Sequence, residues 1–471
     1  MKRLARILPL VCFAVLLVPA LATAAPRMYV GFHDDPNFRY EENRQAVLDQ
    51  ARDARTTIVR TLVTWATIAP SRPLDPTDPF DRKYKFDDLD ELVRNTQQRG
   101  MEVLITIWGT PRWANGGRTP NFLPTNPSDM TAFARAVADR YSGRHEGYPF
   151  VRFYSVWNES NLQLFLAPQF DPRGRSVGPR NYARLYAAAY AGIKGANGRA
   201  QVAIGETSSH GRDRDVPGVS DTHSPGRFAQ LVAAANPRLK FDAWAHHPYP
   251  TPQSLKPTQK VRWPNVTLSS MGRFEEAVDS WFKRKGTRMW ITEYGHEVRQ
   301  DGEPKGVSRA QQAAYATQAL ALAKADLRVD MFVWFVFRDH VTSEWQSGLL
   351  TRAGAPKASL AKWRAAALSV DARNAIFTLR GGTSSPSLSV PLREYATSTD
   401  VGADVGITYR VRLRGKVVAI GQPATVLGSD AVVRFTLTGF RPARKTTYTV
   451  EIEANTANLD PVGRTLTLIT T

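Results

Sequence analysis

The chain has 471 residues, which is more than one ordinary domain needs and enough to bury a large core. Hydrophobic residues make up 42% and charged residues 22%, which excludes disorder throughout. The formal net charge of +19 favours anionic partners, but the arginines are scattered and no nucleic-acid-binding module accompanies them. We therefore expect no nucleic-acid binding. The basic balance indicates a solvated surface, or affinity for an anionic polysaccharide or cell wall.

Residues 1–24 have the pattern of a secretory signal peptide. Lys2, Arg3 and Arg6 precede an apolar stretch, and the small residues Ala-Thr-Ala end the segment. The only cysteine, Cys12, lies inside it, so the mature chain would hold no disulfide and no thiolate site. No later stretch is apolar enough to span a bilayer. We expect a secreted bacterial protein that is monomeric and not bound to a membrane after signal removal.

Residues 25–369 alternate short apolar segments with segments of helical periodicity. Nearly every residue in these short segments is apolar, as in parallel strands that are covered on both faces. The expected strands are 28–32, 57–65, 102–108, 151–157, 201–205, 242–247, 288–292 and 331–337. Eight strands, each followed by a helix, predict a closed (β/α)8 barrel, the TIM barrel. The alternative, a doubly wound open sheet, would have a glycine-rich turn after its first strand, and Gly31-Phe32-His33 is not one.

Residues 370–471 have a different sequence pattern. Short segments in which apolar and polar residues alternate are separated by Gly, Pro, Ser and Asp. The expected strands are 376–379, 386–391, 406–412, 416–420, 431–437, 446–453 and 464–469. This pattern predicts a small all-β sandwich of the Ig-like kind. All eleven tryptophans precede it. Because sugar-binding modules often present tryptophan platforms, we expect a packing or spacer domain, with sugar binding as the alternative.

Two of the expected barrel strands end in a glutamate, Glu159 and Glu293. Catalytic groups of a parallel barrel lie at the carboxyl ends of its strands. Hydrolysis of a glycosidic bond needs such a pair, because one carboxyl group protonates the leaving oxygen while the other attacks or supports the sugar carbon. The sequence therefore predicts a glycosidase site. The alternative for each glutamate is a helix cap or a surface ion pair.

The segments Trp-Asn-Glu at 157–159 and Thr-Glu-Tyr-Gly at 292–295 resemble the fourth- and seventh-strand signatures of clan A glycoside hydrolases, nearest to families five and thirty-nine. The resemblance covers residues 28 to about 368. It implies a retaining glycosidase in which Glu159 is the acid/base and Glu293 the nucleophile. Retention requires the two carboxyl groups to lie about 5–5.5 Å apart, and a separation well above about 6.5 Å would contradict it.

The same resemblance implies roles for five further residues. Asn158 would hold the 2-hydroxyl of the sugar, and Arg60 would stabilise the charge of the nucleophile. Tyr249 would donate a hydrogen bond to the nucleophile, His247 would line the substrate cleft, and Trp334 would stack beneath the scissile sugar. Each of them has a scaffold role as its alternative. Arg60 could be a structural ion-pair residue, and Tyr249 and Trp334 could be ordinary core.

Other polar residues near the expected strand ends carry weaker signals. His246 and His247 are adjacent on a strand and point to opposite faces, so they cannot readily bind one ion, and we expect neither metal nor cofactor. Glu206 and Asp34 are candidates for substrate contacts or simple loop polar groups. Two other functions remain open, a non-catalytic carbohydrate- or cell-wall-binding barrel and a transglycosylase. The sequence does not identify the sugar.

Overall fold

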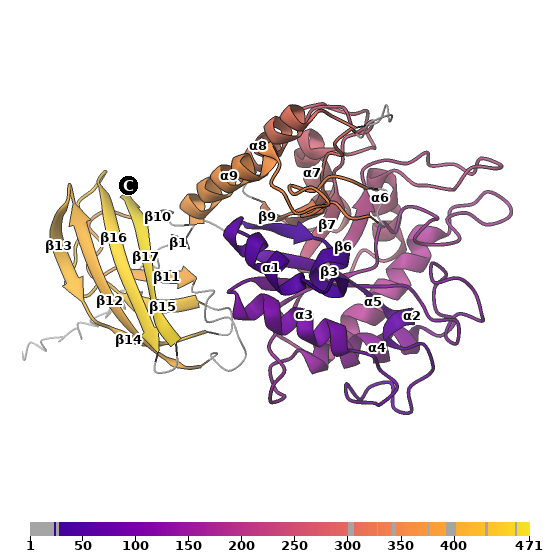
Figure 1. The fold of residues 1–471 in the computed structure, drawn as a ribbon, viewed down its shortest axis with the longest axis horizontal. Helices are drawn as coiled ribbons and strands as arrows, with labels where there is room; N and C mark the ends of the chain where they lie inside the picture. Colours follow the sequence, from indigo (N-terminus) through magenta and orange to yellow (C-terminus); the bar gives the residue numbers. More distant parts are fainter. Residues whose placement is uncertain are drawn as a thin grey trace, which may run out of the picture.

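The computed structural model describes residues 23–24, 28–299, 306–326, 328–341, 345–374, 376–391, 402–428, 432–456 and 459–471. It contains a barrel surrounded by helices and an all-β part that follows it in the chain (Figure 1). The expected signal peptide lies outside the described residues, except for Thr23 and Ala24. Within these ranges no helix is both long and apolar enough to cross a membrane.

The barrel consists of eight parallel strands that follow one another in chain order, with the last pairing back to the first. They are β2 (Tyr29–His33), β3 (Ile58–Thr64), β4 (Glu102–Trp108), β5 (Phe153–Val156), β6 (Gln201–Ser208), β7 (Ala243–His247), β8 (Arg288–Tyr294) and β9 (Val329–Phe335). Each expected strand overlaps one of these. The closed barrel confirms the predicted fold and excludes the open sheet.

Helices lie between the strands and cover the outside of the barrel (Figure 1). They are α1 (Arg44–Asp53), α2 (Trp65–Ile68), α3 (Asp87–Gln98), α4 (Pro127–Arg140), α5 (Gly178–Ala196), α6 (Pro225–Ala235), α7 (Met271–Trp281), α8 (Arg309–Ala325) and α9 (Ala358–Asn374), with the short turns η1 (Pro36–Tyr40) and η2 (Leu268–Ser270). Helix α9 runs through residues 369 and 370, where the sequence suggested a domain boundary. The next strand begins only at Ile376.

Side chains alternate between the inside of the barrel and the layer beneath the helices. On β9, Met331 and Val333 belong to the interior cluster, whereas Phe332 and Trp334 belong to the cluster between strands and helices. This alternation has a period of two residues, and bulges interrupt it in β6 and β8. It therefore decides which residues reach the mouth of the barrel.

The C-terminal part consists of two sheets around one core. The larger sheet has the order β1 (Thr23–Ala24), β10 (Ile376–Leu379), β17 (Leu459–Thr470), β16 (Thr447–Thr456), β12 (Asp404–Leu413), β13 (Lys416–Gly421), with β14 (Ala424–Val426) also paired to β12. The smaller one pairs β11 (Ser387–Pro391) with β15 (Val432–Thr436). Buried residues of both sheets, such as Val411 and Val433, share one cluster. This confirms the predicted all-β sandwich, in which the sequence missed β1 and β14.

Candidate active site

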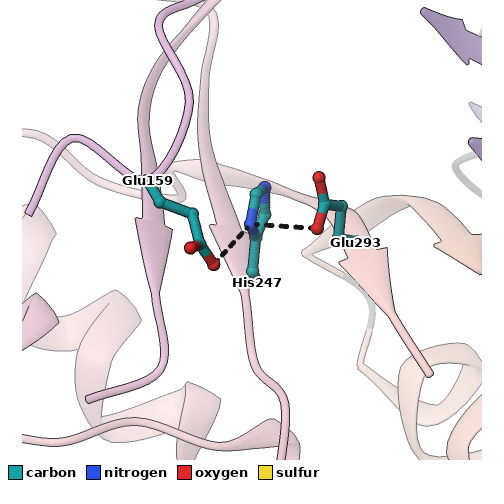
Figure 2. Close-up of side chains that lie close together, drawn as sticks. All are labelled: Glu159, His247 and Glu293. Atoms are coloured by element: carbon teal, nitrogen blue, oxygen red, sulfur yellow. Dashed lines mark hydrogen bonds and ion pairs between the residues drawn. The ribbon is translucent and has the colours of Figure 1, made fainter. Parts of the chain in front are cut away.

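Glu159 and Glu293 face each other at the carboxyl ends of the barrel strands. Figure 2 shows them on opposite sides of the His247 ring, and both carboxylates point toward it. His247 Nδ1 lies 3.2 Å from Glu159 Oε1 and 3.6 Å from Glu293 Oε2. One oxygen of each carboxylate and a ring nitrogen of His247 all lie within 4.8 Å of one another. The two carboxylates thus share one site.

Glu159 reaches this site because the backbone turns sharply after β5. Trp157 and Glu159 have φ angles of 75° and 36°, in the left-handed region that residues other than glycine rarely adopt. The turn is held by Trp157, whose backbone N–H donates to Ile107 O at 2.7 Å and whose indole N–H donates to Phe165 O at 2.7 Å. Backbone strain of this kind costs about 1–3 kcal/mol and tends to occur at functional sites.

Glu293 reaches the site through a bulge in β8. Ile291 pairs with Phe332 and Tyr294 pairs with Trp334, so β8 has one residue more than β9 over this stretch. A bulge of this kind re-aims side chains. As a result Thr292 and Glu293 both serve the site although they are adjacent on one strand: Glu293 bonds Arg60, and Thr292 bonds Glu206.

The Glu293 carboxylate is surrounded by groups that stabilise its charge. Arg60 Nη1 donates to Oε1 at 2.5 Å, and the Tyr249 hydroxyl donates to Oε2 at 3.1 Å. His33 Nδ1 lies 3.4 Å from Oε1. Burial alone would raise the pKa of Glu293, but the charges of His247 and Arg60 and the contact with His33 outweigh it and hold the pKa well below its usual range. Glu293 is therefore ionised at neutral pH.

Arg60 is completely buried and connects several parts of the site. Its Nε donates to Thr106 Oγ1 at 3.0 Å, and its Nη2 donates to Asn158 Oδ1 at 2.8 Å. Nη2 also lies 3.4 Å from Glu206 Oε2. The rigid fork of a guanidinium suits several fixed acceptors at once. The structure thus brings Arg60, Asn158, His247 and Tyr249 together around the two glutamates.

Trp334 is not in the site, which corrects the expected stacking position. Its ring is fully buried between strands and helices, and its indole N–H donates to Ser347 O at 2.9 Å. The ring centroid lies 5.9 Å from that of Trp363 on α9. The alternation along β9 directs Trp334 outward, because its neighbour Val333 points into the barrel.

Phe335 takes the place on the site side of β9. Its half-buried ring lies 5.2 Å from the His33 ring and 6.2 Å from the Trp345 ring, measured between centroids. Trp345 in turn lies 5.3 Å from Tyr249. Phe335, Trp345 and Tyr249 therefore form an aromatic wall beside Glu293. The period-two pattern of the strand was the signal that could have selected Phe335 from the sequence.

Asp34 is not available to a substrate. It is completely buried and accepts hydrogen bonds from the backbone N–H groups of Phe337 at 3.1 Å and Arg338 at 2.9 Å, and from the Asn37 side chain at 2.9 Å. Burial raises its pKa to about 6, with these hydrogen bonds acting in the opposite direction. Asp34 ties the segment after β2 to the segment after β9, so its role is structural.

Glu206 and His33 are central to the site. The sequence marked Glu206 only as a candidate substrate contact or loop polar group, and it did not select His33. Glu206 sits on a second bulge: Gly205 pairs with Ala245 and Thr207 with His246, which leaves Glu206 as the extra residue, at φ 45°. His33 ends β2 at an interior position and contacts both Arg60 and Glu293. No motif marks either residue in the sequence.

The two histidines of β7 have separate environments, as predicted. His246 is buried on the outer side, where Thr207 Oγ1 lies 2.8 Å from its Nδ1, and burial lowers its pKa to about 3. His247 belongs to the site. The ligand atoms of Glu159, His247 and Glu293 are close enough to approach a cation. However, Arg60 bonds Glu293, and although burial lowers the pKa of His247, the neighbouring carboxylates raise it to about 10, so two cationic groups already compensate the carboxylates.

Residues 29–336 match the family model described as Cellulase (glycosyl hydrolase family 5). No curated protein sequence matches the chain.

Among solved structures, the chain is similar to a family 39 glycoside hydrolase from Bacteroides cellulosilyticus, with a TM-score of 0.54 and 16% identity over 88% of this chain and 81% of that one. A family 5, subfamily 18 enzyme from Streptomyces cattleya in complex with GlcNAc has a TM-score of 0.54 and 16% identity over 74% and 81%. An exo-β-1,4-mannosidase from an Opitutaceae bacterium has a TM-score of 0.51 and 15% identity over 76% and 64%. These similarities show the barrel fold, and the family model covers most of the chain. The chain therefore belongs to glycosyl hydrolase family 5 and is a glycosidase.

Proposed function

We propose that the protein is a secreted enzyme that cleaves O-glycosidic bonds of a polysaccharide or oligosaccharide with retention of anomeric configuration. The observation that carries the proposal is the distance between the two glutamates, whose nearest oxygens lie within 4.8 Å of each other. Retaining enzymes have carboxyl groups about 5–5.5 Å apart, whereas inverting enzymes need about 6.5–9.5 Å to admit a water. The short spacing therefore supports retention.

In the first step Glu293 attacks the anomeric carbon while Glu159 protonates the leaving oxygen, which forms a glycosyl ester on Glu293. Arg60 and Tyr249 hold the Glu293 carboxylate and keep it charged. In the second step Glu159, now a base, takes a proton from water, and the water oxygen attacks the anomeric carbon and releases Glu293. A sugar acceptor in place of water would give transglycosylation by the same intermediate.

Secretion is supported by the pattern of residues 1–24. An anionic or wall-associated substrate is supported only by the net charge of +19. The similar structures suggest which sugars to test first, since one is a β-1,4-mannosidase and another holds GlcNAc. Mannosides and GlcNAc-containing oligosaccharides therefore head the substrate panel, followed by glucans, xylans and acidic polysaccharides.

The test is a screen of aryl glycosides and polysaccharides, with the first-formed anomer followed by NMR. We expect turnover with retention, and its loss in both Glu159→Gln and Glu293→Gln. Inversion would contradict the retaining mechanism. If wild type and both variants bind a carbohydrate equally well and none of them turns it over, the protein is a non-catalytic binder and the proposal fails.

A further inference from the structure

Glu206 is a third carboxylate at the centre of the site, and the two-step mechanism gives it no task. Its side chain is completely buried. Oε2 accepts hydrogen bonds from His247 Nε2 at 2.7 Å and from Thr292 Oγ1 at 2.7 Å. A buried charge costs several kcal/mol unless it is paired, and the strained backbone at Glu206 adds to this cost. A residue held at such cost calls for a specific role.

His247 connects Glu206 to the two catalytic glutamates. With Nε2 on Glu206, its Nδ1 is left facing Glu159 at 3.2 Å and Glu293 at 3.6 Å. One N–H can point well at only one of two acceptors at a time. The titratable and charged groups around the ring are Glu159 after β5, Glu206 on β6, Glu293 on β8, Tyr249 and His246 from its own segment, and Arg60 on β3, which bonds Glu293 and lies beside Glu206.

We propose that Glu206 is a positioning residue that holds His247 as an imidazolium between the two glutamates, whose charge stabilises the Glu293 anion before the covalent intermediate forms and whose Nδ1–H serves Glu159 after it. This role rests on the proposed function. The proton stays on His247 throughout, so no N–H bond is made or broken. What changes is the anion that the imidazolium stabilises.

This change follows from the charges of the two glutamates. In the free enzyme the Glu293 anion lies 3.6 Å from Nδ1, beside the hydrogen bond of Nδ1 with Glu159. Once Glu293 is a glycosyl ester it is neutral, and Glu159 becomes the better acceptor beside Nδ1. The Nδ1–H can then orient the Glu159 carboxylate, which is the base that the second step needs.

The protonation state of His247 supports this. Burial lowers the pKa of His247, but the charge of Glu293 and the hydrogen bonds to Glu159 and Glu206 outweigh it and raise the pKa to about 10. Glu206 is the member of this set that keeps its charge in both states, since Glu159 is a neutral acid before the first step and Glu293 is an ester after it. The Arg60 and His247 charges in turn hold the pKa of Glu206 below its usual value, against the effect of burial.

The first experiment needs no turnover. The His247 imidazole is followed by ¹⁵N NMR of the full chain labelled at histidine, with the signal assigned from the spectrum of His247→Gln. In the wild type we expect both ring nitrogens to stay protonated through pH 8. A neutral ring at pH 7 would overturn the proposal without any variant at Glu206.

The second arm of this experiment compares Glu206→Gln with Glu206→Asp. The glutamine keeps the size of the side chain and removes its charge, so we expect the His247 midpoint to fall by about one pH unit or more. The aspartate keeps the charge and should shift the midpoint less. An equal midpoint in wild type and Glu206→Gln would overturn the proposal.

Kinetics then separate positioning from a merely structural effect. With a dinitrophenyl glycoside of a sugar that the wild type accepts, the leaving group needs no protonation and the second step limits kcat. In Glu206→Gln we expect the acid limb of kcat to move up by about one pH unit, kcat at pH 6 to fall about tenfold or more, and KM to fall as the intermediate accumulates.

The outcomes distinguish this proposal from the proposed function. Suppose that the wild type hydrolyses a glycoside, and that Glu206→Gln lowers kcat and kcat/KM equally without shifting the limbs of the pH profile. Glu206 is then only structural and the positioning role is wrong, while the enzyme assignment stands. If the wild type turns over no glycoside in the panel, the proposed function falls, and this role falls with it.

Discussion

Arg60 Nη1 lies 2.5 Å from Glu293 Oε1, and the guanidinium is completely buried. Removing one partner of a buried ion pair leaves the other charge uncompensated, which costs about 3–5 kcal/mol. We expect Arg60→Met to lower the free energy of unfolding by this amount. It should also raise the pKa of Glu293, so the acid limb of kcat/KM should move to higher pH.

The matched control for Arg60 is Arg52→Met, which removes an exposed arginine whose Nη2 lies 3.2 Å from Asp53 Oδ1. Exposed pairs contribute about 0–1 kcal/mol. Chemical denaturation and pH–rate profiles measure both variants. Equal stability losses in the two, or an acid limb that does not move in Arg60→Met, would contradict the role of Arg60.

Tyr249 donates a hydrogen bond to the other oxygen of Glu293, Oε2, at 3.1 Å. A hydrogen bond to a charged group contributes about 1.5–3 kcal/mol, so Tyr249→Phe should lower kcat/KM about 10- to 100-fold. Tyr186→Phe is the control, because its hydroxyl bonds the backbone oxygen of Lys240 at 3.1 Å, away from the carboxylates. The control should keep its kcat/KM. A Tyr249→Phe enzyme with unchanged kcat/KM would show that this bond is unimportant in the transition state.

Phe335 and Trp334 are neighbours on β9 with opposite surroundings. Phe335 is half-buried beside His33 and Trp345, whereas Trp334 is fully buried in the core. We expect Phe335→Ala to raise KM with little effect on stability. Trp334→Ala should destabilise the protein by about 3–5 kcal/mol and leave the KM of the folded enzyme unchanged. Steady-state kinetics and denaturation check the pair, and the reverse assignment of effects would restore Trp334 as the sugar platform.

Much of this arrangement follows from the sequence, because strong local patterns determine it. The eight apolar segments and their intervening helices predict the barrel, and the two glutamates stand directly after such segments. Arg60 and His247 lie an even number of residues beyond the interior residues Ile58 and Ala245, so the same periodicity brings them to the mouth.

The remainder depends on local breaks in that periodicity. The bulges that contain Glu206 and Glu293 appear in the strand pairing and have no sequence signature here. Glu293 was selected because a familiar motif surrounds it in addition to its place after an apolar segment, whereas Glu206 had no such motif. Trp334 is the opposite case, a residue that the family resemblance selected wrongly. The strand alternation directs its side chain into the core.

Glu275 on α7 should make stability depend on pH. It is buried, and burial with the neighbouring Asp326 raises its pKa to about 8, which the Arg328 guanidinium 3.5 Å away offsets only in part. The folded protein therefore holds this proton above pH 4.5, the ordinary value, where the unfolded chain releases it. Stability from this group is present at low pH and is lost as the pH rises from 4.5 to about 8.

Glu275→Gln mimics the protonated side chain at every pH. Its Tm relative to the wild type should therefore rise between pH 5 and pH 8.5, and circular dichroism melts at the two pH values measure this. A Tm difference that stays constant between the two pH values would contradict the raised pKa of Glu275.

The central claim is that Glu293 forms a covalent bond to the sugar, with Glu159 opposite it. A 2-deoxy-2-fluoro glycoside of the sugar found in the panel slows the release of such an intermediate, and mass spectrometry of the proteolysed enzyme locates the label. We expect a single adduct on the peptide that contains Glu293, formed more slowly in Arg60→Met. A label on Glu159 or Glu206, or an active enzyme that inverts its product and takes up no label, would contradict the account.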